Sequence, residues 1–162
     1  MKCQIRLAEN QDADAISRVI TAALRQTNAR DYPAEVIARV EQNFTAQAIL
    51  SLMLKREVYV AAFERAVVAT ASLDGAVIRT VFVDPLHQRS GIGRQLMAVI
   101  ESSARSAGLT ELRVPSSITA QRFYASLGFD VEREEFYEGE RTIIMRRKLE
   151  AKHGQSCQAL GK

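Results

Sequence analysis

The sequence lacks tryptophan, has only three prolines and two cysteines, and contains no apolar run long enough to cross a membrane. A transmembrane helix needs roughly 18 or more consecutive apolar residues, so we expect no membrane partner. Cys3 and Cys157 lie near opposite ends of the chain, with no C-x-x-C motif or histidine pair beside them. We therefore expect no metal site, two reduced thiols and a cytoplasmic protein, although a disulfide between the cysteines stays open.

The excess of one charge sign is also small, because 22 lysines and arginines against 19 aspartates and glutamates give a net charge of +3. Charges of both signs are scattered, which is weak evidence for nucleic-acid binding and fits one local anion site at least as well. A hydrophobic fraction of 47% and a charged fraction of 25% are typical of a globular protein. We expect a single domain over residues 1–150 and a mobile tail over 151–162, where periodicity is lost.

The hydrophobic pattern predicts a helical front third, then a β meander, then alternating strands and helices. Helical spacing recurs in three stretches within residues 12–56, and Thr45 is a candidate cap for the third. Asp74-Gly75, a strong hairpin signal, links two of the strands that follow. The expected strands lie at 4–8, 58–63, 66–73, 76–83, 109–114, 129–136 and 142–149, and the later helices at 91–107 and 117–127. This order indicates one mixed α/β domain.

The most informative segment is 81–94, where a buried strand ends, a short polar loop follows and a long helix begins at or just before Gly91. The first backbone amides of a helix have no intrahelical partner and carry the positive end of the helix dipole. Gly91 and Gly93 omit side chains that would hold an anion away from those amides. Three basic residues lie in the same segment: His87, Arg89 and Arg94. The pattern predicts an anion site, most naturally for a pyrophosphate.

Two common nucleotide-binding classes do not fit this loop. The chain has neither G-x-x-x-x-G-K-[ST] nor G-x-G-x-x-G, and the strands before the loop form a meander rather than β-α-β units. This argues against a P-loop NTPase and against a Rossmann domain. Taken alone, a G-x-G sequence is better explained by simple glycines at a helix start.

Two signatures together resemble the GNAT superfamily of N-acetyltransferases. Residues 88–93, Gln-Arg-Ser-Gly-Ile-Gly, resemble its acetyl-CoA signature [QR]-x-x-G-x-[GA], and residues 117–129 resemble its later motif, Asn-x-x-Ala-x-x-Phe-Tyr leading to Leu-Gly-Phe. The resemblance implies a single mixed, mainly antiparallel, twisted sheet of about six to seven strands flanked by helices. It also implies transfer of an acetyl group from acetyl-CoA to a primary amine by direct attack in a ternary complex.

The resemblance assigns roles to individual residues. Tyr124 matches the tyrosine that protonates the departing CoA thiolate; the alternative from the pattern alone is a half-buried core tyrosine. Ser117 stands where the family has asparagine and offers the pantetheine fewer donors. The expected cofactor contacts are Phe82, Val83, Gln88, Arg89, Ser90, Gly91, Ile92, Gly93, Arg94, Ser117 and Phe123.

No general base is evident in the sequence. The family's glutamate early in the strand before the loop falls on Val77, and Asp74 and Asp84 are better explained as turn residues. We expect water to relay the proton to a carboxylate at the rim. Arg79 is placed on the same strand face as Val81 and Val83, where it either reaches solvent at the strand edge or clamps a substrate carboxylate.

The leading hypothesis is an N-acetyltransferase acting on a small molecule or peptide amine, and the alternative is a non-catalytic acyl-CoA sensor of the same fold. A nucleic-acid-binding domain is disfavoured, because the basic run 146–148 is typical of a solvated strand edge. Residues 12–56 and 136–141 should shape the acceptor pocket, with Tyr32 and Phe44 better explained by core or surface packing. A homodimer formed through an exposed late strand is allowed but not required.

Overall fold

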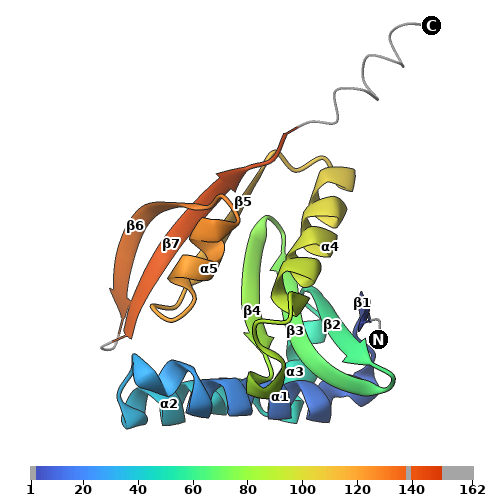
Figure 1. Cartoon of the computed structure of the whole chain (residues 1–162), viewed down its shortest axis with the longest axis vertical. Helices are drawn as coiled ribbons and strands as arrows, with labels where there is room; N and C mark the ends of the chain where they lie inside the picture. Colours follow the sequence, from blue (N-terminus) through green and yellow to red (C-terminus); the bar gives the residue numbers. More distant parts are fainter. Residues whose placement is uncertain (1–2, 138–139, 151–162) are drawn as a thin grey trace, which may run out of the picture.

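The computed structural model of the chain describes residues 3–137 and 140–150. A seven-stranded sheet, in the order β1-β2-β3-β4-β5-β7-β6, runs through the molecule (Figure 1). Its strands are β1 (Cys3–Leu7), β2 (Glu57–Phe63), β3 (Ala66–Asp74), β4 (Val77–Val83), β5 (Glu111–Ser116), β6 (Asp130–Tyr137) and β7 (Glu140–Lys148). The helices are α1 (Ala13–Gln26), α2 (Ala34–Glu41), α3 (Ala46–Met53), α4 (Ile92–Ser106) and α5 (Gln121–Ser126). The expected tail at 151–162, with Cys157, lies outside the described residues, and Cys3 is a free thiol.

Strands β2, β3 and β4 form the predicted antiparallel meander. Gly75 has a φ of +62° in the turn between β3 and β4, a conformation that glycine adopts without a Cβ penalty. Small buried side chains, Ala61, Ala69 and Ala71 among them, line the face of the meander under α4, so the helix can approach the sheet closely. The hairpin prediction is confirmed.

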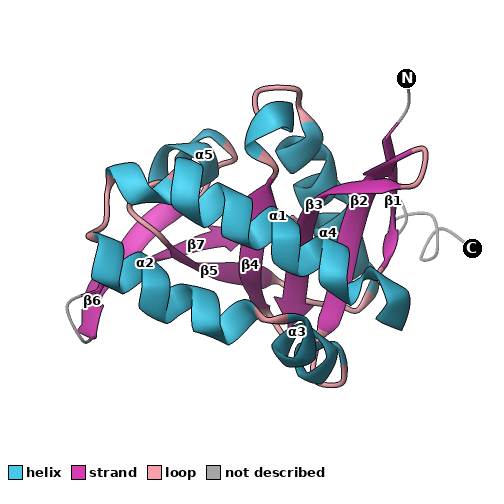
Figure 2. Cartoon of the chain, turned by 90° about the horizontal axis from the view of Figure 1, so that it is seen from below, coloured by secondary structure: helices cyan, strands magenta, loops and turns pink. Residues whose placement is uncertain are grey.

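The helices cover the two faces of the sheet in separate groups. Helices α1, α2 and α3 lie on one face, while α4 and α5 lie on the other (Figure 2). Ile16, Ile20 and Leu24 of α1 pack with Ile49 of α3, and Ile100 of α4 is fully buried in the second cluster. Thr45 caps α3 by accepting a hydrogen bond from the backbone N–H of Ala48 at 3.2 Å, as predicted. Within the described residues, no helix has the length and apolar character of a membrane span.

The sheet opens between β4 and β5. These parallel strands share one register pair, Val77 with Arg113, and separate beyond it (Figure 1). On its other side β4 has an irregular register with β3 between Thr70 and Ser72, and Thr80 takes a left-handed φ of +57°. An extra residue in one strand reverses the alternation of its side chains. The open edges of β4 and β5 therefore face each other across a gap that no backbone pairing closes.

The irregularity at Thr80 corrects the predicted orientation of Arg79. Arg79 pairs with Ser72, whereas Val83 pairs with Ala69, so Arg79 and Val83 lie on opposite faces of the sheet. The Arg79 guanidinium donates to Asp74 at 3.1 Å and is 41% exposed. The expectation that Arg79 shares a face with Val81 and Val83 was wrong. It assumed that side chains alternate strictly along the strand, and a bulge breaks that alternation.

The short helix α5 begins later than predicted. Strand β5 continues to Ser116, and the Ser117 hydroxyl then accepts a hydrogen bond from the Ala120 N–H at 3.1 Å. A serine hydroxyl that binds a nearby amide offers the backbone a turn in place of a helix. Residues 117–120 thus form a turn, and α5 covers only Gln121–Ser126.

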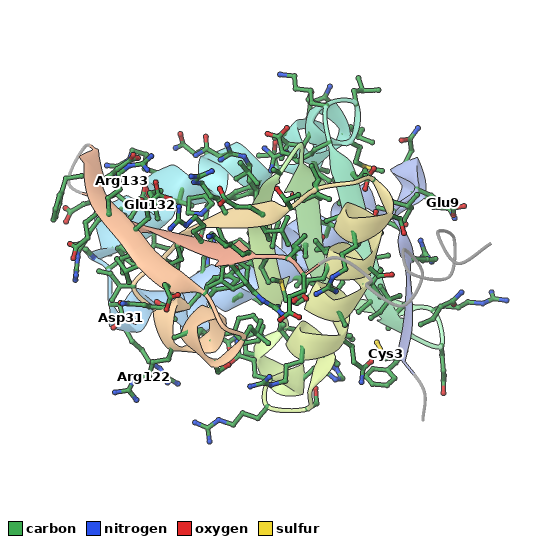
Figure 3. The ribbon with its side chains drawn as sticks, turned by 90° about the horizontal axis from the view of Figure 1, so that it is seen from above. Cys3, Glu9, Asp31, Arg122, Glu132 and Arg133 are labelled. Carbon is green, nitrogen blue, oxygen red and sulfur yellow. The ribbon has the colours of Figure 1, made fainter. Side chains whose placement is uncertain are left out.

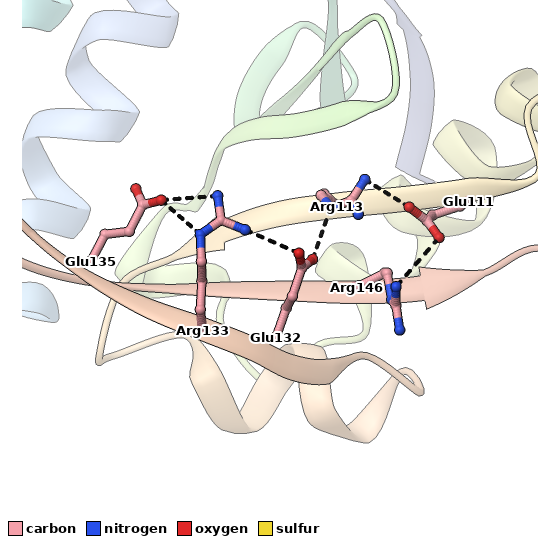
Figure 4. Close-up of polar contacts among 6 residues, drawn as sticks. All are labelled: Glu111, Arg113, Glu132, Arg133, Glu135 and Arg146. Atoms are coloured by element: carbon pink, nitrogen blue, oxygen red, sulfur yellow. Dashed lines mark hydrogen bonds and ion pairs between the residues drawn. The ribbon is translucent and has the colours of Figure 1, made fainter.

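The arginines at the end of β7 are paired with carboxylates from neighbouring elements. Arg146 lies 4.0 Å from Glu111, which also pairs with Arg113, and Arg113 pairs with Glu132 on β6 (Figure 4). Arg147 is hydrogen-bonded to Glu101 of α4. The charges of these three arginines are thus matched by carboxylates of α4, β5 and β6.

Candidate active site

A cavity of about 770 Å³ occupies the opening between β4 and β5. Its walls come from the C-terminal end of α1, from α2, from the loop before α4, and from α5 and β7. Eleven of the twelve residues predicted to bind cofactor or to act in catalysis line it: Phe82, Val83, Gln88, Arg89, Gly91, Ile92, Gly93, Arg94, Ser117, Phe123 and Tyr124. Ser90 is the exception, because its hydroxyl turns back and donates to the carbonyl of His87.

The loop before α4 is shaped by hydrogen bonds and two left-handed residues. Asp84 accepts from the Leu86 N–H at 2.9 Å, which closes a short 3-10 turn at Pro85–His87 and confirms its prediction as a turn residue. Arg89 and Gly91 have φ values of +64° and +85°. No atom lies within 4 Å of the position a Gly91 Cβ would take, so glycine is needed there for the backbone angle, and space is left in front of the α4 amides.

Position 93 has a reason to be glycine that the sequence analysis did not predict. A Cβ on Gly93 would lie 3.1 Å from Cζ and 3.3 Å from Cε1 of Phe123. The missing side chain therefore makes room for the aromatic ring of α5, and Gly93 also lines the cavity. This contact joins the start of α4 to α5, the helix that holds Tyr124.

The open edge of β4 presents backbone groups to the cavity. The Asp84 N–H donates to Val68 on β3 at 2.8 Å, so the preceding residue, Val83, directs its N–H and C=O to the opposite edge. The Val83 carbonyl accepts there from the Gln88 side chain at 3.3 Å. Phe82 pairs with Thr70 and turns its backbone toward β3, and its ring packs edge-on against Phe44 at 6.1 Å between centroids. Of the two predicted strand residues, Val83 is the one with backbone groups facing the cavity.

Tyr124 is 3% exposed and packs between two rings of its own motif. The ring centroids of Phe123 and Phe129 lie 5.2 and 5.8 Å away. Burial raises the pKa of the Tyr124 phenol, so the group stays protonated at neutral pH. Its hydroxyl has no hydrogen-bond partner among the described residues and is not a fully buried atom, so the hydroxyl opens to the cavity that Tyr124 lines. A protonated, unpartnered phenol in a cavity is suited to donate a proton.

Tyr32 joins the front helices to the far half of the sheet. Its hydroxyl accepts from the Ile118 N–H at 2.7 Å and donates to the Arg141 carbonyl at 3.1 Å. Burial raises the pKa of this phenol, and the nearby Glu140 carboxylate adds to the rise. Thr119 donates to Asp31 at 2.8 Å, and Asp31 lies at the edge of the molecule near α5 (Figure 3). Tyr32 and Phe44 pack against the core cluster of α1 and α3, as expected, and both also line the cavity.

The ionisable residues of the cavity are segregated by sign. The basic ones, His87, Arg89 and Arg94, come from the loop and the start of α4. Among the described lining residues, Glu140 at the start of β7 is the sole carboxylate, and the sequence analysis did not single it out. Val77, Asp74, Arg79 and Asp84 do not line the cavity.

Asn28 is a second residue that the sequence analysis missed. It is 8% exposed and lines the cavity, and its side-chain amide has no partner among the described residues. No described side-chain polar atom is both fully buried and unpartnered, so the Asn28 amide reaches the cavity surface, where it is available to a ligand. No motif marks Asn28, because its position depends on where α1 ends against the sheet.

Comparison with known proteins identifies relatives of this fold. The profile of the acetyltransferase (GNAT) domain matches residues 28–149. A GCN5-related N-acetyltransferase from Rhodopseudomonas palustris superposes with a TM-score of 0.86 at 21% identity, covering 92% of this chain and 97% of that one. PaiA N-acetyltransferase from Thermoplasma acidophilum, in complex with coenzyme A, gives 0.79 at 19% identity, covering 91% and 99%. YncA from Salmonella typhimurium, solved with acetyl-CoA, gives 0.64 at 23%, covering 93% and 95%. No curated protein matches the chain in sequence. The predicted fold class is confirmed.

Proposed function

Because the chain belongs to the acetyltransferase (GNAT) family, we propose that it moves an acetyl group from acetyl-CoA to a primary amine of a small molecule or peptide. The observation that carries this proposal is one cavity lined both by the glycine-containing, basic loop before α4 and by the Tyr124 phenol. The family and the relatives with bound coenzyme A or acetyl-CoA support acetyl transfer in general terms. The amine acceptor, the direct mechanism and the cytoplasmic location are parts of the proposal.

The chain's own groups fit acetyl-CoA in two places. The pyrophosphate would lie at the amides of residues 89–94, in the space kept open at Gly91 and beside Arg89 and Arg94. The pantetheine arm would pair as an added strand with the backbone of Val83, which points into the gap between β4 and β5. This would place the thioester near Tyr124, where the opening narrows toward the pairing of Val77 with Arg113.

Transfer then needs one bond to form, one to break and two protons to move. The neutral amine nitrogen attacks the thioester carbon, the C–N bond forms, and the C–S bond breaks. Tyr124 gives its proton to the leaving thiolate, and the proton lost by the nitrogen leaves through water toward Glu140. Burial raises the pKa of the Tyr124 phenol, and the same desolvation would raise the pKa of a thiol placed beside it.

An acceptor screen with free CoA as the readout tests the proposal. Amino acids, polyamines, aminoglycosides and peptide N-termini are each incubated with acetyl-CoA, and the acetylated amine is identified by mass. An acyl-CoA sensor, the alternative function, would bind acetyl-CoA and release no CoA above background with any amine.

The loop assignment has its own test with a matched control. Gly91 and Gly108 lie at opposite ends of α4 with φ values of +85° and +83°, and neither has an atom within 4 Å of its Cβ position. Gly91→Glu and Gly108→Glu therefore carry similar backbone strain, but only the first adds a negative charge at the proposed pyrophosphate site. We expect Gly91→Glu to abolish acetyl-CoA binding in calorimetry while Gly108→Glu retains it. Equal affinity in both variants would refute the loop assignment.

A further inference from the structure

The acceptor end of the cavity differs in chemistry from the cofactor end. Its walls come from α2, from the turn after it and from β7, and they include Val36, Ile37, Val40, Phe44, Glu140 and Thr142. Val36 and Ile37 are buried, while Val40 and Phe44 are half-buried against the cavity. This end of the cavity, which we call the acceptor wall, is apolar apart from one carboxylate and one hydroxyl.

Among the described residues that line the acceptor wall, none is basic. The basic residues that line the cavity, His87, Arg89 and Arg94, all belong to the loop and the start of α4. Arg141 follows Glu140 directly but turns away, and its guanidinium donates to Glu134 on β6 at 2.8 and 3.0 Å. A buried carboxylate without a basic or hydrogen-bonding partner is strongly disfavoured, and Glu140 would repel it further.

We propose that the acceptor is an amine with an apolar body and no carboxylate, bound with that body on the acceptor wall and with Glu140 balancing its positive charge. This inference rests on the proposed acetyl transfer and narrows its substrate class. The ring of Phe44, packed edge-on to Phe82 at 6.1 Å, gives a flat apolar surface for an aromatic or branched body. The unpartnered amide of Asn28 supplies a neutral polar contact that does not compensate a negative charge.

Three acceptors of one skeleton isolate the effect of the carboxylate. They are 2-phenylethylamine, L-phenylalaninamide and L-phenylalanine, in which the α-substituent is hydrogen, a neutral amide or a carboxylate. Because the three amines differ in basicity, kcat/KM is calculated on the concentration of neutral amine. We expect this value for phenylalanine to be about 100-fold below that for phenylalaninamide, since an ionised group left unpaired in a buried site costs at least this factor. The diamine 1,4-diaminobutane should also be poor, because it lacks the apolar body.

A charge-insertion pair tests whether the acceptor wall causes the discrimination. Val40→Arg places a guanidinium on the wall, and Leu54→Arg adds the same charge at a site that is 90% exposed and outside the cavity. Val40→Arg should raise the phenylalanine-to-phenylalaninamide ratio about tenfold. Glu140→Gln should raise it less, and Leu54→Arg should leave it unchanged. A ratio near one in the unmodified protein, or an equal change in both arginine variants, would overturn the proposal.

Binding in the absence of turnover separates this inference from the proposed function. Calorimetric titration of the three amines into the protein saturated with CoA forms a complex that cannot react. If phenylalaninamide binds more tightly than phenylalanine but no acetylated product forms in the acceptor screen, the proposed ligand class stands and the proposed acetyl transfer is rejected. Acetyl transfer to phenylalanine and phenylalaninamide at equal rates would retain the acetyltransferase and reject the acceptor class.

Discussion

The contact between Gly93 and Phe123 predicts a measurable energetic coupling between α4 and α5. Gly93→Ala would put a Cβ 3.1 Å from the tip of the Phe123 ring, tighter than an ordinary carbon contact of about 3.5–4.0 Å. Overpacking of this kind costs about 1–3 kcal/mol, while replacing glycine by alanine within a helix returns about 1 kcal/mol. The free energy of unfolding should therefore fall by about 0–2 kcal/mol.

Removing the Phe123 ring should reverse the sign of the effect that Gly93→Ala has on the free energy of unfolding. In a Phe123→Leu background the obstructing atoms are gone, and Gly93→Ala should then stabilise the protein by up to about 1 kcal/mol. The coupling energy from the four proteins of this cycle, measured by urea unfolding followed by circular dichroism, should equal the overpacking cost of about 1–3 kcal/mol. Gly91→Ala is the control, because it carries strain of about 1–2 kcal/mol with no atom near its Cβ position, and it should cost the same in both backgrounds.

Additive effects of Gly93→Ala and Phe123→Leu on the free energy of unfolding would refute the proposed coupling. If Gly93→Ala changes the free energy of unfolding equally with phenylalanine or leucine at position 123, the ring is not what requires glycine there. Gly93 would then return to the role expected from sequence, that of a small residue in front of an anion.

Two further perturbations probe the contacts that hold the site. Tyr32→Phe leaves the Ile118 N–H and the Arg141 carbonyl without a partner, so the free energy of unfolding should fall by about 1–3 kcal/mol and KM for the acceptor should rise, with acetyl-CoA affinity unchanged. An unchanged unfolding free energy would contradict the bridging role. The Arg6 guanidinium lowers the pKa of Asp12 below its ordinary 3.8, so the stabilising effect of Asp12 is present above pH 3.8 and is lost as pH falls through the lower folded value. Asp12→Asn should thus cost most near neutral pH and little at pH 2, and an equal cost at both would contradict the assignment.

Local chemistry explains why much of the fold and the cofactor end could be predicted. The Asp74-Gly75 turn and the Thr45 cap act over a few residues, and both are found as expected. The loop and α5 have short signatures whose side chains come together because the topology places α4 beside α5. Eleven of the twelve predicted site residues consequently share one cavity.

The acceptor end depends on long-range packing that short motifs do not encode. The bulge at Thr80 reverses the face of Arg79, and nothing in the residue types of β4 announces it. Glu140 and Tyr32 are more than 100 residues apart, and their approach depends on how the segment before α2 meets β7, where the Tyr32 hydroxyl donates to the Arg141 carbonyl. Asn28 enters the cavity for the same reason.

The central claim, acetyl transfer assisted by Tyr124, is tested most directly by comparing Tyr124→Phe with the unmodified protein in two measurements. One is the Kd for acetyl-CoA, and the other is kcat for the best amine of the screen. The variant keeps the packed ring between Phe123 and Phe129 and loses only the hydroxyl that opens to the cavity. Loss of a general acid should lower kcat about 100-fold or more with Kd nearly unchanged. Equal kcat in the two proteins at equal Kd would contradict the role of Tyr124, and no acetylated product from either would contradict acetyl transfer itself.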